Sequence, residues 1–190
     1  RETGFGTLAI NGVDGPLFAH IPFLISDDGT LAEFHLVRSN PIARALRESA
    51  KVRLAVNGPH SYVSPDWYGV DDQVPTWNYV AVHLVGTAHI ATQETLHSLL
   101  DRLSAQFEDR LAPKKPWVSD KMGDGVMDKM MRQIQPFTMQ VADIEGTWKL
   151  NQNKSDAVRN SAADHIDAYG IGADVRLLSA LMRNPPRSTD

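Results

Sequence analysis

The sequence predicts a small antiparallel β-barrel of the α+β class, with inserted and C-terminal helices. Several short segments alternate apolar and polar residues, which is the pattern of half-buried strands. Turn pairs such as Asn11-Gly12 and Asp28-Gly29 join the first segments directly, as in antiparallel hairpins. Other segments carry apolar residues at helical spacing, and the clearest of these is Thr92–Leu111.

The first third of the chain is predicted to contain consecutive hairpins and then one helix. The strands expected there are Phe5–Ile10, Leu17–Ile25 and Thr30–Val37. Asn40 precedes Pro41, and Asn is a favoured helix N-cap while Pro is favoured at the first helical position. We therefore expect a helix from Pro41 to about Ser49.

The remaining elements complete the barrel and its helical additions. A strand over Val52–Asn57 is expected to bend at Gly58-Pro59 and to resume over His60–Ser64. A later strand, ending at Ile144, is expected to turn at Glu145-Gly146 and to return over Thr147–Leu150. The other predicted helices are Gly125–Gln133, Ser155–Tyr169 and Asp174–Met182. No repeat or linker divides the chain, so we expect one domain over residues 1–190, with its core at about 5–153 and C-terminal helices over 154–184.

The strand predicted within Val74–Ile90 has two faces of different character. One face is apolar apart from Asn78, and the other carries Trp77, Tyr79 and His83. If the barrel core lies under the apolar face, these three rings face a cofactor, a second subunit or a covering helix such as Thr92–Leu111. The pattern is compatible with all three.

Composition limits the class of protein. The 190 residues carry a formal net charge of −4 and include no cysteine, which excludes disulfides and thiolate zinc sites. A reducing compartment fits this composition, so the expected location is cytoplasmic, and no apolar run is long enough to span a membrane. The basic residues form no concentrated stripe, so direct nucleic-acid binding is disfavoured. The histidines lack metal-ligand spacing, and no phosphate-binding loop or nucleophile elbow occurs.

The stretch His35–Pro41 has the chemistry of a phosphate site. A strand is predicted to end there and a helix to begin, so unpaired backbone donors meet the guanidinium of Arg38 and the hydroxyl of Ser39. The alternative is an ordinary capped helix beside a surface arginine.

Two other stretches suit a planar ligand. The segment Gly58–Tyr68 is rich in aromatic and imidazole rings, which can stack on a ligand, pack across a subunit interface or fill the core. Lys149 lies close to Asn151 and Gln152. A lysine there is either at a solvated strand end or placed to stabilise negative charge on a bound ring.

Together these stretches resemble the PaiB-like family, often described as FMN-binding negative transcriptional regulators. The matching words are HLVRSNP (35–41), GPHSYVSPDWY (58–68), VPTWNYVAVH (74–83) and GTWKLNQN (146–153), and HIPFLI (20–25) also fits. The likeness extends from about Phe5 to Asn153. The chain departs from the family pattern at Asn151, where serine is common, and it lacks the leading segment that usually precedes the position of Arg1.

The resemblance implies an FMN-binding split β-barrel, related to pyridoxamine-phosphate oxidases and flavin reductases. It also implies a homodimer that holds FMN at the subunit interface; another flavin and haem are the alternative cofactors. With the matching words, it indicates the following cofactor-binding residues: His35, Arg38, Ser39, Asn40, Tyr62, Ser64, Trp77, Tyr79, Lys149 and Gln152.

The resemblance leaves more than one function open. The family description implies a regulator of transcription. The alternative is a flavin-dependent oxidoreductase that accepts hydride from a nicotinamide or reduces a small molecule. Direct DNA binding by the dimer is a third function, and the acidic net charge disfavours it.

Overall fold

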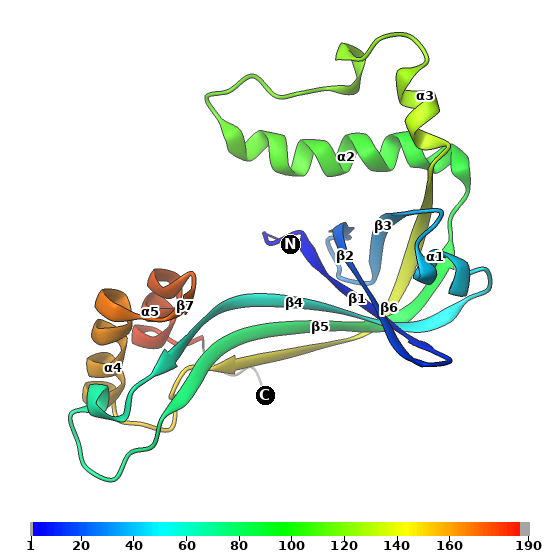
Figure 1. Ribbon diagram of the computed structural model, residues 1–190. Helices are drawn as coiled ribbons and strands as arrows, with labels where there is room; N and C mark the ends of the chain where they lie inside the picture. The colour runs from blue at the N-terminus through cyan, green and yellow to red at the C-terminus, as the bar shows by residue number, and fades with distance from the viewer. Residues whose placement is uncertain (1, 187–190) are drawn as a thin grey trace. The chain divides into compact units, whose positions relative to one another are not determined.

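One antiparallel sheet organises the computed structural model, which describes residues 2–186 (Figure 1). Its strands are β1 (Phe5–Gly12), β2 (Gly15–Ile25), β3 (Leu31–Val37), β4 (Ala50–Val63), β5 (Thr76–Ile90), β6 (Ile134–Lys149) and β7 (Gly172–Ala173). They are ordered β1-β2-β3-β6-β5-β4-β7, and β1 also pairs with β4. That extra pairing closes every strand except β7 into a ring, so the predicted antiparallel barrel of the α+β class is confirmed.

Helices are inserted between strands and follow the last long strand. They are α1 (Pro41–Ala45), α2 (Leu96–Glu108), α3 (Val126–Met131), α4 (Asp156–Tyr169) and α5 (Val175–Arg183). Short 3-10 helices cover Pro65–Tyr68 (η1), Gln93–Thr95 (η2), Asp109–Leu111 (η3) and Ser119–Lys121 (η4). Within residues 2–186 no helix has the length and apolar character needed to cross a membrane.

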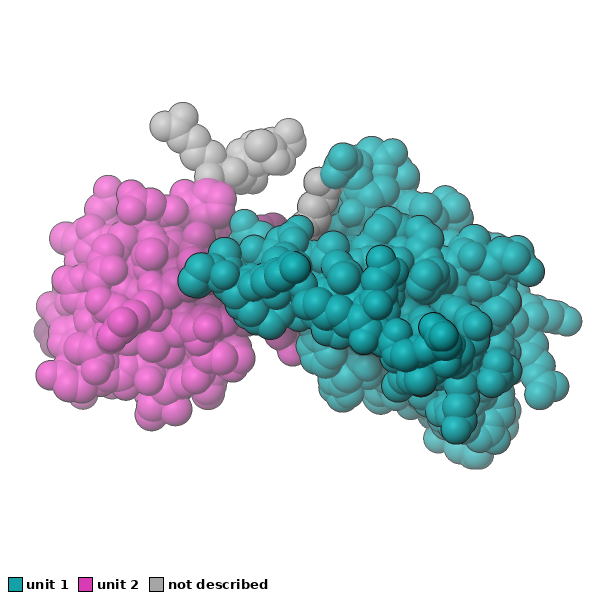
Figure 2. All heavy atoms as spheres, turned by 90° about the horizontal axis from the view of Figure 1, so that it is seen from above, with its two compact units in different colours: residues 1–56, 83–144 teal, residues 57–82, 145–190 magenta. Residues whose placement is uncertain are grey.

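Contacts between residues divide the chain into two compact units (Figure 2). Unit 1 contains Arg1–Val56 and His83–Ile144, and unit 2 contains Asn57–Val82 and Glu145–Asp190. The long strands β4, β5 and β6 each contribute residues to both units. The β1–β4 pairing lies wholly in unit 1, where Thr7, Leu8 and Ala9 pair with Ala55, Leu54 and Arg53.

The barrel core of unit 1 forms because apolar residues alternate along its strands. Phe34 on β3 pairs with Phe137 on β6, and their rings stack with centroids 5.5 Å apart. On α2, Leu96, Leu99 and Leu103 are buried, and the helix contacts β2 and β3. The apolar stripe predicted for this helix therefore packs against the sheet.

Unit 2 has a core of its own. Its buried members are Val63, Tyr68, Leu150, Ala162, Ala163, Ile166, Leu178 and Met182. Arg159 on α4 is also buried; its Nε donates to the Met182 carbonyl at 2.7 Å, and its Nη2 pairs with Asp156 at 2.7 Å. These bonds satisfy the buried guanidinium and connect α4 to the end of α5.

Two predicted interruptions of the strands are wrong. β6 runs through Glu145-Gly146 to Lys149, and β4 runs through Gly58-Pro59 to Val63. A Cβ at Gly146 would overlap the ring of Trp148, and a Cβ at Gly58 would lie 3.0 Å from the Val80 carbonyl oxygen. Both glycines therefore make room for a neighbour in extended structure and do not turn the chain.

The first helix is also shorter than predicted. It ends at Ala45, where Leu46 is the C-cap and donates its N–H to the Ile42 carbonyl. β4 begins at Ala50, earlier than the predicted Val52, which leaves a short connection between the two elements.

We predict that Gly86→Ala destabilises the fold. A Cβ at Gly86 would overlap the backbone carbonyl of Gln140 on β6, and that carbonyl cannot rotate away as a side chain can. The free energy of unfolding, measured by denaturant titration, should fall by about 1–3 kcal/mol or more. Gly123→Ala is the control, because the nearest atom to its Cβ would be 3.8 Å away. Equal loss in both variants would contradict this explanation.

Candidate functional site

Arg38 follows β3 and is held by hydrogen bonds from several segments. Its Nε donates to the Arg132 carbonyl at 2.9 Å, and Nη1 and Nη2 donate to the side-chain oxygens of Gln135 and Gln93, both at 2.6 Å. All three acceptors are neutral. The guanidinium is therefore fixed in position while its positive charge is not balanced by a carboxylate.

Arg38 lines a pocket of about 210 Å³ in unit 1 together with Arg44 and Arg47. We call this the arginine pocket; Ala43, Ile90 and Gln135 complete its lining. Arg44 donates to the Ser39 carbonyl at 2.6 Å. Within residues 2–186, Arg47 has no hydrogen-bond or ion-pair partner. Three guanidinium groups line the pocket and no carboxylate does. The pocket therefore suits a multiply charged anion.

The N-cap role of Asn40 is confirmed, because its Oδ1 accepts from the Ile42 N–H at 2.8 Å. This bond engages the side-chain oxygen within the protein. Since α1 has only 5 residues, its dipole adds little to anion binding, and the arginines provide the attraction instead.

The sequence analysis did not identify Arg44 and Arg47 as candidate binding residues. Their three-residue separation, shortly after the predicted strand end at Val37 and after Arg38, was the available signal.

His35, on β3 in unit 1, has a ring nitrogen without a hydrogen bond. Its Nδ1 is buried and has no hydrogen-bond partner among the described residues. Burial disfavours the charged imidazolium and lowers the pKa of His35 below its ordinary value of 6.5. A neutral ring with a buried, unpaired nitrogen is able to bond a polar group of a ligand.

In unit 2, aromatic and imidazole rings from β4, η1, β5 and α4 gather into one cluster. Tyr62 meets Trp77 and Trp67 edge-on, with centroids 6.2 and 6.5 Å apart. His60 lies 6.1 Å from Trp77, and Trp67 stacks on His165 at 6.0 Å. The cluster is a rigid apolar surface with polar edges.

A pocket of about 350 Å³ opens beside this cluster, and we call it the aromatic pocket. It is lined by Asn57, Gly58, His60, Trp77, Tyr79, Val80 and Ala81. Trp77 and Tyr79 keep 46% and 36% of their surface exposed, while Asn78 between them is buried. The predicted division of this strand into two faces is therefore confirmed around Asn78, and Trp77 and Tyr79 are accessible in unit 2. In the middle of the strand, from Val80 to His83, residues of both faces are half-buried.

The other predicted residues of unit 2 lie near the ends of their strands. Lys149 donates from Nζ to the Thr76 hydroxyl at 2.7 Å and remains exposed. Gln152 uses both ends of its amide locally: Oε1 accepts from the Leu150 N–H at 2.8 Å, and Nε2 donates to the Trp148 carbonyl. Ser64 is the N-cap residue of η1, but its hydroxyl makes no capping hydrogen bond.

The predicted cofactor residues thus fall into two groups, each described within its own unit. Unit 1 holds His35, Arg38, Ser39 and Asn40, and unit 2 holds Tyr62, Ser64, Trp77, Tyr79, Lys149 and Gln152. Trp77 and Tyr79 line one pocket and Tyr62 contacts Trp77. In unit 1 only Arg38 among the predicted residues lines the arginine pocket.

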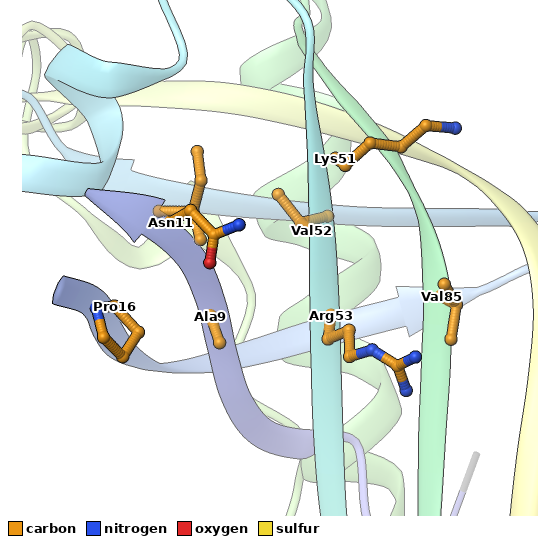
Figure 3. A pocket seen from close by; sticks show the side chains of 8 residues that line it. Ala9, Asn11, Pro16, Lys51, Val52, Arg53 and Val85 are labelled. Atoms are coloured by element: carbon orange, nitrogen blue, oxygen red, sulfur yellow. The ribbon is translucent and has the colours of Figure 1, made fainter. Parts of the chain in front are cut away.

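Another pocket of unit 1, of about 220 Å³, contains none of the predicted residues (Figure 3). It opens where β1 and β4 part, beyond their last pair Ala9 and Arg53. Asn11, Lys51 and Val85 are among the residues around it.

Comparison with known proteins assigns the family. A family model described as "Putative FMN-binding domain" matches residues 1–143. The chain belongs to this family. It is also 30% identical over 158 residues to "Protease synthase and sporulation protein PAI 2" of Bacillus subtilis, an alignment that covers 82% of this chain and 75% of the relative. The resemblance to PaiB-like proteins is therefore confirmed.

Solved structures with the same fold are distant in sequence. The FAD and heme binding protein from Mycobacterium smegmatis matches with a TM-score of 0.58 and 18% identity, over 90% of this chain and 75% of that one. The flavocytochrome Anf3 from Azotobacter vinelandii matches with a TM-score of 0.51 and 16% identity, over 77% of this chain and 62% of that one. Identity this low is informative about the fold alone, and the split-barrel fold is confirmed.

We predict that His35 makes the stability of this FMN-binding-domain family member fall in mild acid. Because burial lowers the pKa of His35 in the folded state, the unfolded chain binds the proton more readily. Its contribution to stability is complete above the ordinary value of 6.5 and is lost as the pH falls below that value. Urea titrations between about pH 5 and 7 should show this loss.

The matched variants for that experiment are His35→Gln and His89→Gln, the second on an exposed position of β5. Only His35→Gln should flatten the pH dependence. An unchanged profile for His35→Gln would show that the half-buried ring does not titrate as the structure implies.

Proposed function

We propose that this protein binds FMN and that the arginine pocket holds its phosphate. The observation that carries the proposal is the lining of that pocket by Arg38, Arg44 and Arg47 without a carboxylate. A phosphate monoester carries close to two negative charges at neutral pH, and guanidinium groups bond such oxygens in pairs. The description of the family that this chain belongs to names the same cofactor.

The chemistry of the available donors fits FMN. Guanidinium groups suit the phosphate, and the neutral His35, with its buried unpaired Nδ1, suits a hydroxyl or amide of the cofactor. When bound, FMN supplies electron or hydride transfer at its ring system. The role of unit 1 is to hold the phosphate. Within unit 2, Lys149 is an exposed cation that favours negative charge close to it.

We further propose a homodimer with FMN at the subunit interface. The support is the exposed aromatic surface of Trp77 and Tyr79 beside the aromatic pocket. Large aromatic side chains are enriched where subunits meet, and a planar ring system packs well on them. Tyr62 and His60 back the Trp77 ring and limit its movement.

The regulatory role named for PaiB-like proteins is our proposal for the biological function. With a net charge of −4 and no basic stripe, the chain is expected to act through a ligand or a protein partner in the cytoplasm. A gel-shift series over salt concentration tests this, because retarded DNA at low salt would favour direct binding instead.

A flavin-dependent oxidoreductase is the second candidate, since Lys149 offers the positive charge that a reduced flavin ring favours. The discriminating experiment is anaerobic addition of NADH or NADPH. Rapid bleaching of bound flavin would support the oxidoreductase, and flavin that stays oxidised would favour the regulator.

We predict that Arg47→Gln weakens FMN binding and leaves riboflavin binding unchanged. Arg47 has no partner within residues 2–186, so its loss removes a phosphate contact without breaking a bond of the fold. A charge-assisted contact contributes about 1.5–3 kcal/mol, so the Kd for FMN should rise roughly tenfold or more in fluorescence titrations. Arg38→Ala should do the same but should also reduce stability, because three hydrogen bonds are lost.

Arg176→Gln, an exposed substitution on α5, is the control for charge alone. If Arg47→Gln and Arg176→Gln bind FMN equally well, the phosphate does not lie in the arginine pocket.

We predict that Trp77→Ala weakens both flavin binding and dimerisation. The substitution removes a half-exposed ring that lines the aromatic pocket. Analytical ultracentrifugation and flavin titration should both change, with loss of a large interface aromatic costing about 2 kcal/mol or more. Val74→Ala, an exposed apolar position in the preceding loop, is the control. Normal values in both measurements would limit Trp77 to a structural role.

A further inference from the structure

Two cavities adjoin each other in unit 1. Residues of α2 and of the segment that joins α2 to α3 line both cavities, and residues of α3 and the start of β6 line only the first. Figure 1 shows how these elements are arranged. The first, of about 380 Å³, is lined by Leu100, Trp117, Met122, Met127, Met130 and Ile134, and we call it the methionine cavity. The second, of about 360 Å³, is lined by Asp101, Asp109 and Asp120 and also by Ala105, Pro116, Val118 and Ser119, and we call it the acidic cavity. Trp117 and Ser104 line both.

Trp117, which lines both cavities, is fixed in position by contacts within the protein. The backbone N–H of Trp117 donates to the Glu108 carboxylate at 2.8 Å, and Lys114 forms an ion pair with the same carboxylate. The hydrogen bond from Lys114 is the main reason that the pKa of Glu108 is lowered, so this clamp persists in mild acid. The segment around Trp117 is therefore fastened to the C-terminal end of α2.

The methionine cavity has the character of a small-molecule site. Its size is typical of such sites, and its lining is almost wholly apolar. Met130 keeps 56% of its surface exposed, so its side chain is accessible to a ligand. Unbranched methionine side chains adapt to ligands of varied shape.

The acidic cavity selects the charge of the ligand. Among residues 2–186, no lysine or arginine pairs with Asp101, Asp109 or Asp120; Asp101 has only the exposed His97, at 3.9 Å. Two lysines of the same segment are engaged elsewhere, Lys114 by Glu108 and Lys121 by the Pro116 carbonyl at 3.0 Å, and Lys115 lines neither cavity. A cation beside Trp117 would also gain from the face of its ring.

We propose that the two cavities together bind an amphiphilic amine, with its ammonium group among the aspartates and its apolar part among the methionines. The size and apolar lining of the methionine cavity are the evidence for a ligand, and the aspartates favour a positive charge at one end of that ligand. The site contains none of the residues assigned to FMN, so it stands or falls independently of flavin binding.

The test is a titration of the FMN-saturated protein with 4-phenylbutylamine, followed by NMR of ¹³C-labelled methionine methyl groups. Met122, Met127 and Met130 should shift in a saturable manner. Met139 and Met182 have no exposed surface and provide internal controls that should not move. The neutral alcohol 4-phenylbutan-1-ol should bind about tenfold more weakly, and 4-phenylbutanoate should not bind, because the aspartates attract only the cation.

A pair of charge variants separates this site from non-specific adsorption. Asp109→Asn combined with Asp120→Asn should weaken the amine about fivefold and leave the alcohol unchanged. Asp128→Asn on α3, which lines neither cavity, should change nothing. Equal binding of amine and alcohol, or methionine shifts that depend on protein concentration without amine, would overturn the proposal. The second result would mean that another copy of the chain covers the cavity.

Discussion

The arrangement around Arg38 is the constraint on which the candidate phosphate site depends. Its guanidinium bonds three neutral oxygens, from Gln93 before α2, Arg132 after α3 and Gln135 on β6. Hydrogen bonds of this kind to a charged donor stabilise by about 1.5–3 kcal/mol each, so they tie the end of β3 to segments far away in the sequence. Neutral acceptors leave the charge available, whereas a carboxylate would have cancelled it.

This constraint also explains how the neighbouring arginines reach the same pocket. Asn40 caps α1 immediately after Arg38, and the buried Ile42 and Leu46 hold one side of the following turn against the core. Arg44 and Arg47 then project on the side that remains. The positive charge of the pocket is thus a consequence of how a strand ends and a short helix begins.

In unit 2, a buried hydrogen bond connects two of the sequence motifs that resemble the family, those at residues 58–68 and 146–153. Asn151 donates from Nδ2 to the Tyr68 hydroxyl at 3.1 Å, and burial raises the pKa of that tyrosine. Asn151 has a positive φ of 63°, a conformation that asparagine tolerates better than most residues. The departure from serine at this position is therefore compatible with the local backbone.

The sequence by itself determined the order of the elements, the two faces of β5, the cap at Asn40 and the family, because these depend on local periodicity and on specific words. It did not determine that β4 continues through Gly58, since the Val80 carbonyl that this glycine accommodates is brought close only by the fold. At Gly146 the neighbour is Trp148, two residues along β6, and the structure shows that the glycine makes room for its ring in extended structure. Likewise, the hydrogen bonds that fix Arg38 depend on distant residues meeting, since Gln93, Arg132 and Gln135 lie far from it in the sequence. The burial of the unpaired nitrogen of His35 is also a property of the tertiary structure, because it depends on which segments pack around the ring.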